Sequence, residues 1–252
     1  MTELLVVSDG WDPTAQLLGD AGRRLGGAVT ELDLRLDRLT VEVGPEGADV
    51  RHRGRRLRPD VVVNRSGITG LGLADGALLE RQRPHGWFER HVAARQEQGL
   101  LLAATDAWAR SGATVLNPPT SEDLSLLTNA VAERLARRGV RTRRAGTSDE
   151  IEIVVASGRG VTYRADGEAP DRSMVEVATI VAAAAGFDVG SVRLVSDDRG
   201  VVVTGWDHRP ELSTWPDADR IALGILLTVP GLDGRELGTT PPRFFAEDLD
   251  RR

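Results

Sequence analysis

The regular alternation of short apolar strands with helices over the first 140 residues is the feature that most constrains the fold. The segments 4–7 and 60–65 are continuous apolar runs that end in polar residues, which is typical of strands buried on both faces of a sheet. Helical patterns follow over 13–25 and 85–111, and each ends at glycine. This alternation predicts a parallel α/β sheet in the N-terminal part of the chain.

The pattern changes after residue 118. Two antiparallel hairpins are predicted over 151–165 and 191–206, and an alanine-rich helix over 172–185 separates them. A last helix is expected over 217–227. The fold class predicted from this order is α/β, with a parallel-sheet N-terminal domain followed by a smaller α+β domain.

We therefore expect three parts. The predicted boundaries are 1–118 for the parallel-sheet domain, 119–238 for the α+β domain and 239–252 for a tail. The tail carries Phe244-Phe245 between a proline pair and acidic residues, so it docks either on its own domain or on a partner.

Charge and composition exclude several functions. The net charge of -6 and the pI near 5.4 disfavour non-specific binding to nucleic acid. Cysteine is absent, which removes disulfides, thiolate nucleophiles and cysteine metal sites. The N-terminus lacks a signal-peptide pattern, and the longest apolar stretch, 174–187, contains Glu176. These features predict a cytoplasmic protein without a membrane span.

All 32 basic residues are arginine, because the sequence contains no lysine. Base composition is one explanation, and the loss of lysine-dependent nucleotide chemistry is the other. The arginines concentrate over 51–58 and 134–144. Each cluster is either a solvated face or a site for phosphates, carboxylates or an acidic peptide. The four histidines lack a zinc-ligand spacing, so no metal site is predicted from them.

Four segments in order resemble the ATP-grasp superfamily, particularly its glutamate-ligase and graspetide peptide-maturase branches. Residues 59–65 are similar to the "PDVVxNR" strand, and 115–119 to the "VLNPP" linker. The helix over 121–138 followed by Gly139 resembles the next element, and 182–210 resembles the final paired strands. The resemblance implies a pre-ATP-grasp-like domain joined to an ATP-grasp-like domain.

The departures from this family are more informative than the matches. The resemblance implies lysines that hold ATP on a lid, but only about 50 residues separate Gly139 from Phe187, so most of the lid is expected to be missing. It also implies acidic magnesium ligands where this chain has Arg193 and Gly205-Trp206-Asp207. At about 4 Å and an effective dielectric near 20, a guanidinium repels a divalent ion by roughly 8 kcal/mol. Asp207 alone does not offset that repulsion.

The leading hypothesis is a non-catalytic, lid-deleted protein that holds an acidic peptide or an active ligase partner, without cofactor and without catalytic residues. We also expect it to form an oligomer. The predicted ligand-binding residues are Arg65, Arg193, Asp207, His208 and Arg209. The alternative hypothesis is an enzyme, an ATP- and magnesium-dependent carboxylate-amine ligase in which arginines replace the phosphate lysines. The sequence leaves the ligand, the partner and the pathway open.

Overall fold

The N-terminal part is built on a four-stranded parallel sheet, as the sequence predicts. The computed structural model describes residues 1–44, 47–66, 87–119, 128–143, 150–165 and 169–232. The strand order is β2-β1-β6-β7, and every neighbouring pair is parallel. The strands are β1 (Glu3–Ser8), β2 (Ala28–Asp33), β6 (Val61–Asn64) and β7 (Thr114–Leu116).

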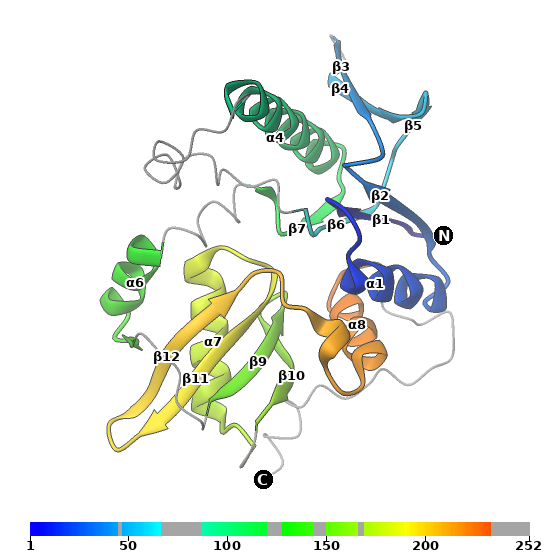
Figure 1. Ribbon diagram of the computed structural model, residues 1–252. Helices are drawn as coiled ribbons and strands as arrows, with labels where there is room; N and C mark the ends of the chain where they lie inside the picture. Colours follow the sequence, from blue (N-terminus) through cyan, green and yellow to red (C-terminus); the bar gives the residue numbers. More distant parts are fainter. Residues whose placement is uncertain (45–46, 67–86, 120–127, 144–149, 166–168, 233–252) are drawn as a thin grey trace.

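Helices cover both faces of this sheet, which explains its apolar strands. Leu4 and Val6 pack in the cluster that contains α1 (Pro13–Arg24). Leu5 and Val7 alternate with them and pack against α4 (Trp87–Arg110). The side chains of a strand alternate between faces, so β1 contributes to two cores. Figure 1 shows α4 and α1 on opposite sides of the sheet.

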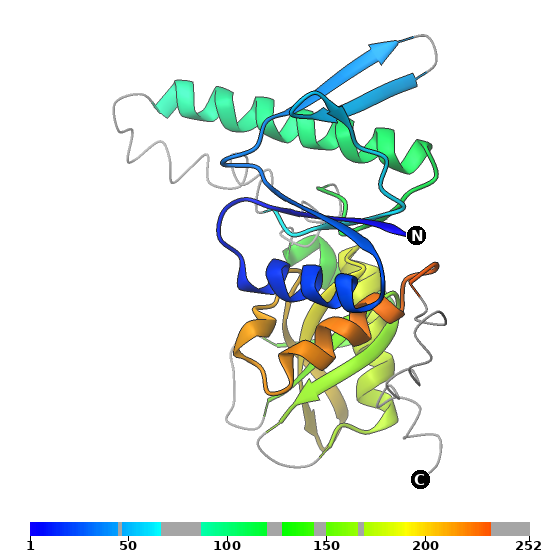
Figure 2. The ribbon, with the colours of Figure 1, turned by 90° about the vertical axis from the view of Figure 1, so that its right-hand side faces the viewer.

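The arginine cluster over 51–58 belongs to a small antiparallel sheet that extends beyond α4 (Figure 2). Its strands are β3 (Leu39–Gly44), β4 (Gly47–His52) and β5 (Arg55–Arg56). Several of these arginines are paired on the surface: Arg51 with Asp49 and Glu42, Arg53 with Asp37, and Arg56 with Asp49. Exposed pairs of this kind contribute little to stability.

The C-terminal part is built on a five-stranded sheet in the order β10-β9-β11-β12-β8. Both predicted hairpins are present, and the alanine-rich helix α7 begins after its cap Asp171 and ends at Gly186. The short strand β8, parallel to β12, was not predicted. The elements are α6 (Thr128–Arg137), β8 (Arg141–Thr142), β9 (Ile151–Ala156), β10 (Arg159–Arg164), α7 (Arg172–Ala185), β11 (Val189–Asp197) and β12 (Gly200–Asp207).

Only one face of this sheet is fully covered by its own helices. Ile153 and Val192 pack on the face that meets α6 and α7. Val154 and Ala156 point to the opposite face and join the core of α1 and α8 (Ala218–Leu227). The short helix η1 (Leu212–Thr214) leads into α8. Figure 2 shows α1 and α8 side by side between the two sheets.

One buried cluster therefore takes side chains from both sides of residue 118, including Leu4 and Val154. The division into domains 1–118 and 119–238 stays a prediction, and the tail 239–252 lies outside the described residues. So do the start of the predicted helix over 121–138 and residues 67–86. None of the helices in the described part of the chain is both long and apolar enough to cross a membrane.

Candidate functional site

The paired strands β11 and β12 bring Arg193, Gly205 and Asp207 to one face of the C-terminal sheet. Arg193 is opposite Gly205 in the register, and Ser191 is opposite Asp207. The register shifts next to this pair, so that Thr204 is an extra residue in β12. Such a bulge reverses which face the following side chains take. Trp206 therefore joins the α7 core, while Gly205 and Asp207 share the opposite face with Arg193.

The guanidinium of Arg193 lies directly over Gly205. A Cβ atom placed on Gly205 would be 2.5 Å from Nη2 of Arg193, closer than real Cβ atoms approach other heavy atoms. The side chain of Arg193 is exposed, and no described residue forms an ion pair with it. Arg193 is therefore a cation with free donors, held across a glycine that leaves room for it.

The carboxylate of Glu152, on the same face, is already engaged. Glu152 is opposite Arg193 in the pairing of β9 with β11. Its Oε1 accepts a hydrogen bond of 2.6 Å from the Ser191 hydroxyl, and its Oε2 lies 2.8 Å from Nη2 of Arg164. The Arg164 guanidinium also lies 4.9 Å from the ring centroid of Trp215. Together Arg164, Glu152, Ser191, Arg193 and Asp207 form what we call the polar row.

The polar row does not fit a magnesium ion. Of the three positions where the family resemblance places metal ligands, only Asp207 carries a carboxylate, and its Oδ1 accepts a hydrogen bond from the backbone N–H of Arg209. Gly205 has no side chain, and Arg193 adds a positive charge that repels a divalent ion. Within the described residues, no group of three or more His, Cys, Asp or Glu side chains is arranged to hold a metal.

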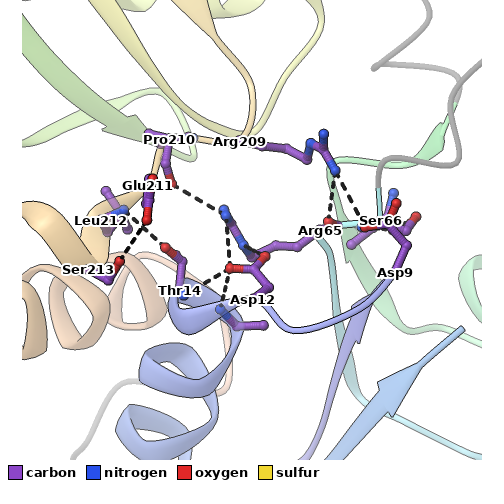
Figure 3. Close-up of polar contacts among 12 residues, drawn as sticks. Asp9, Asp12, Thr14, Arg65, Ser66, Arg209, Pro210, Glu211, Leu212 and Ser213 are labelled. Atoms are coloured by element: carbon purple, nitrogen blue, oxygen red, sulfur yellow. Dashed lines mark hydrogen bonds and ion pairs between the residues drawn. The ribbon is translucent and has the colours of Figure 1, made fainter. Parts of the chain in front are cut away.

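Arg65 lies in the junction between the two sheets, among residues of α1 and of the segment after β12 (Figure 3). It follows β6 and is only 5% exposed. Its Nε donates to Oδ2 of Asp12 at 2.7 Å, and its Nη2 lies 3.4 Å from the carbonyl oxygen of Pro210. Asp12 also caps α1 through the backbone N–H groups of Thr14 and Ala15. The guanidinium of Arg65 thus connects the N-terminal sheet, α1 and the segment after β12.

Arg209 belongs to the same junction. Its Nη1 donates to the carbonyl oxygen of Arg65 at 3.3 Å and lies 3.7 Å from Oδ1 of Asp9 (Figure 3). The side chain is 35% exposed, so part of the guanidinium remains in solvent. Arg209 is therefore partly committed to the fold, in contrast to Arg193.

Asn117 ties the end of β7 to the C-terminal sheet. Its Nδ2 donates to the carbonyl oxygens of Val189 and His208, at 2.7 and 3.0 Å. Its Oδ1 accepts from the backbone N–H groups of Asp188 and Val189, at 2.8 and 2.9 Å. Asn117 is buried and has a φ of 51°, a conformation that asparagine tolerates better than most residues. The amide side chain therefore satisfies four backbone groups at once.

His208 is half-buried, and its backbone carbonyl oxygen is the one that accepts from Asn117. Burial lowers the pKa of its imidazole to about 4, against a smaller opposite effect of the Asp207 charge. The imidazole is therefore neutral near pH 7. A neutral ring adds no charge to a site for an acidic ligand.

The structure separates the five predicted ligand-binding residues into two groups. Arg193 and Asp207 share the polar row, while Arg65, His208 and Arg209 belong to the junction. Sequence reasoning missed the partners of both groups, especially Glu152 and Asn117. The only available signals were the isolated acidic residue within Ile151-Glu152-Ile153 and an asparagine directly after a strand. Neither indicates a contact with a distant segment.

No protein-family profile and no curated protein sequence matches this chain. Several solved structures are similar to it. The chain is similar to the ATP-grasp ligase PsnB, solved with a phosphomimetic variant of its minimal precursor, Mg and ADP, at 15% identity and a TM-score of 0.65. This match covers 83% of the present chain and 91% of PsnB.

Two macrocyclases from Microcystis aeruginosa MRC are also similar. MdnB matches at 13% identity and a TM-score of 0.58, over 99% of both chains. MdnC, solved with its precursor peptide MdnA, matches at 10% identity and a TM-score of 0.62, over 90% of this chain and 99% of MdnC. The chain thus has the ATP-grasp fold with a truncated C-terminal part, as the sequence resemblance implies.

Proposed function

We propose that this protein is a non-catalytic member of the ATP-grasp fold that binds an acidic peptide on the polar row. The observation that carries the proposal is the position of Arg193 over Gly205, where the resemblance places two acidic magnesium ligands. A guanidinium at this position repels a metal ion and attracts a carboxylate. The absence of lysine from the sequence agrees with a loss of phosphate binding.

A peptide ligand is supported by the similar structures. PsnB and MdnC are both solved with precursor peptides, so this fold accommodates a peptide chain. In the present chain, Arg193 and Arg164 supply two guanidinium groups on the same sheet face, and Glu152 engages only Arg164 as an ion pair. Planar guanidinium groups bind carboxylates with two parallel hydrogen bonds. An acidic peptide, free or presented by an active ligase, is the partner that this arrangement favours.

Calorimetry tests this proposal directly. A C-terminally amidated peptide containing several glutamates is titrated into the protein, with the glutamine version of the same peptide as its control. We expect binding of the glutamate peptide only, with the same affinity in magnesium and in EDTA. The Arg193→Gln variant should bind about tenfold more weakly, as expected for one lost charge-assisted hydrogen-bonded contact. Equal binding by Arg193→Gln would contradict the proposal.

Arg199 provides a matched control, because it is an exposed arginine in the turn of the same hairpin. Arg199→Gln removes the same charge from the protein without changing the polar row, so it should bind the glutamate peptide like the wild type. Equal weakening in both variants would mean that net charge alone determines the affinity.

The ligase alternative rests on Asp207, the one carboxylate left at the predicted metal positions. Under that alternative, Mg-ATP produces binding heat and ATP is hydrolysed when peptide is present, and Asp207→Ala abolishes both. We expect neither heat nor turnover. Conversely, the double variant Arg193→Asp with Gly205→Glu restores three acidic side chains on one face. It should bind Mg²⁺ or Mn²⁺ measurably while the wild type does not.

A further inference from the structure

The small antiparallel sheet has two edges, and only one of them is protected against pairing with another strand. The edge strand β5 consists of two residues, Arg55 and Arg56, and both are exposed. Short edge strands and exposed charges are features that prevent edge-to-edge pairing in natural sheets. The opposite edge strand, β3, has six residues without a proline or a basic side chain, and its register with β4 contains no bulge. Among the described residues, only β4 pairs with β3.

The outer side of β3 presents backbone groups that β4 does not use. Val41 is opposite Val50 in the register of the hairpin. The carbonyl oxygen of Val50 accepts a hydrogen bond of 2.8 Å from the backbone N–H of Leu57, on the β5 side of β4. The N–H and C=O of a strand residue point to the same side, so Val41 and Val50 are not a hydrogen-bonded pair. The backbone groups of Val41 therefore point outward, as do those of Leu39 and Val43, two residues away in each direction.

The apolar side chains of β3 become more exposed along the strand. Leu39, Val41 and Val43 share one face, because side chains alternate between faces. Leu39 is 7% exposed, Val41 is partly buried against the core that contains α4, and Val43 is 84% exposed. Figure 2 shows the hairpin of β3 and β4 extending beyond α4. The end of β3 thus combines an exposed apolar side chain with outward backbone donors and acceptors.

We propose that β3 pairs with β3 of a second copy of this chain, antiparallel and about a two-fold axis at Val41. Such a pairing uses the same surface on both copies and closes at the dimer. Val41 is then opposite Val41 of the second copy, and Val43 is opposite Leu39. All outward N–H and C=O groups of these three residues find partners in this register. The two small sheets form one continuous sheet.

The charges of β3 favour a second copy over an acidic peptide. Glu42 is the only charged residue of the strand, and it lies on the face opposite to Val41 and Val43. In the two-fold register the residue opposite Glu42 is the neutral Thr40 of the second copy, so no like charges face each other. A peptide rich in aspartate or glutamate would instead place a carboxylate beside Glu42, which destabilises strand pairing. This edge is therefore separate in function from the polar row.

Sedimentation velocity of the full chain tests the proposal. We expect a monomer that converts to a dimer between about 1 and 200 µM, since an interface formed by one strand pair is small and weak. Val43→Pro removes an outward N–H and no hydrogen bond to β4, a position that tolerates proline. It should raise the dissociation constant about 30-fold, because the dimer loses two hydrogen bonds. Trp11→Ser is the control, since it removes a side chain that is 80% exposed and lies outside β3. It should dimerise like the wild type.

Two variants of the exposed Thr40 test the register. Thr40→Glu places a carboxylate opposite Glu42 at two symmetric positions and should weaken the dimer about fivefold, whereas Thr40→Arg should strengthen it about fivefold. They also test the proposal if Val43→Pro fails to give the wild-type circular dichroism spectrum. A monomer at every concentration, assembly beyond the dimer, equal effects of the two Thr40 variants, or a folded Val43→Pro protein that dimerises like the wild type would each overturn the proposal. None of these outcomes affects the glutamate-peptide test.

Discussion

Two arginines of this molecule illustrate how position determines the role of a side chain. Arg65 is 5% exposed and donates to Asp12 and to the carbonyl oxygen of Pro210. Arg193 is exposed and lies over Gly205 without an ion-pair partner among the described residues. Both were predicted from the sequence to bind a ligand. The structure shows that the guanidinium of Arg65 is already used to join the two halves, whereas that of Arg193 is available.

The largest effect is expected at the junction. Arg65→Met leaves the carboxylate of Asp12 without its buried partner, and breaking such a pair costs about 4 kcal/mol of unfolding free energy. Urea denaturation measures this loss. The exposed Arg23, which pairs with Asp20 and Glu31, is the control, and Arg23→Met should lose less than about 1 kcal/mol. Similar losses at both sites would remove the distinction between junction and surface arginines.

The next largest effect depends on pH. Burial lowers the pKa of His208 from the ordinary 6.5 to about 4, so between these pH values the unfolded chain binds a proton that the folded chain excludes. The free energy of unfolding is therefore unaffected by His208 above pH 6.5. It decreases as the pH falls from 6.5 towards 4, because protonation of the imidazole favours the unfolded chain. The total loss is about 3 kcal/mol.

His208→Gln should remove this part of the pH dependence, and urea denaturation between pH 4 and 7 measures the difference from the wild type. Burial raises the pKa of Asp188, which stabilises the fold as the pH falls and therefore acts in the opposite direction. This contribution is common to both proteins and cancels in the comparison. Parallel stability curves would show that the imidazole is solvated and not part of the buried junction.

A smaller effect is expected at Asn117. Asn117→Ala removes the side chain that satisfies backbone groups of Asp188, Val189 and His208. We expect a loss of about 2 kcal/mol, less than for Arg65 because no charge is left buried. Thermal unfolding measures it, and Asn129→Ala, at an exposed position on α6, is the control. An unchanged midpoint would mean that the junction depends on Arg65 alone.

The sequence predicted the elements better than the contacts between them. The strand over 60–65 was found because a continuous apolar run ending in polar residues has few other interpretations. The strand β8 was missed because it has only two residues and pairs in parallel with β12, about 60 residues away. A pairing of this kind depends on the tertiary fold and leaves no local periodicity.

For the candidate site, too, the sequence predicted residues but not the contacts between them. Arg193 and Asp207 were identified because they replace expected ligands in a recognisable motif, and the register confirms that they share one face. The room that Gly205 provides for Arg193 depends on a bulge at Thr204, which the alternation of residue types does not reveal. The pairing of Arg65 with Asp12, 53 residues away, likewise requires the folded chain.

The smallest effect on stability is expected at Arg193, and it is the one that separates the two arginines most directly. Arg193→Gln removes a guanidinium that no described residue pairs with, so the unfolding free energy should change by less than about 0.5 kcal/mol. Urea denaturation measures this value on the same preparation that is used for peptide binding. A protein that keeps its stability but loses affinity for the glutamate peptide places Arg193 in ligand binding. A loss comparable to that of Arg65→Met would instead mean that Arg193 supports the sheet, and the polar row would then be part of the fold like the junction.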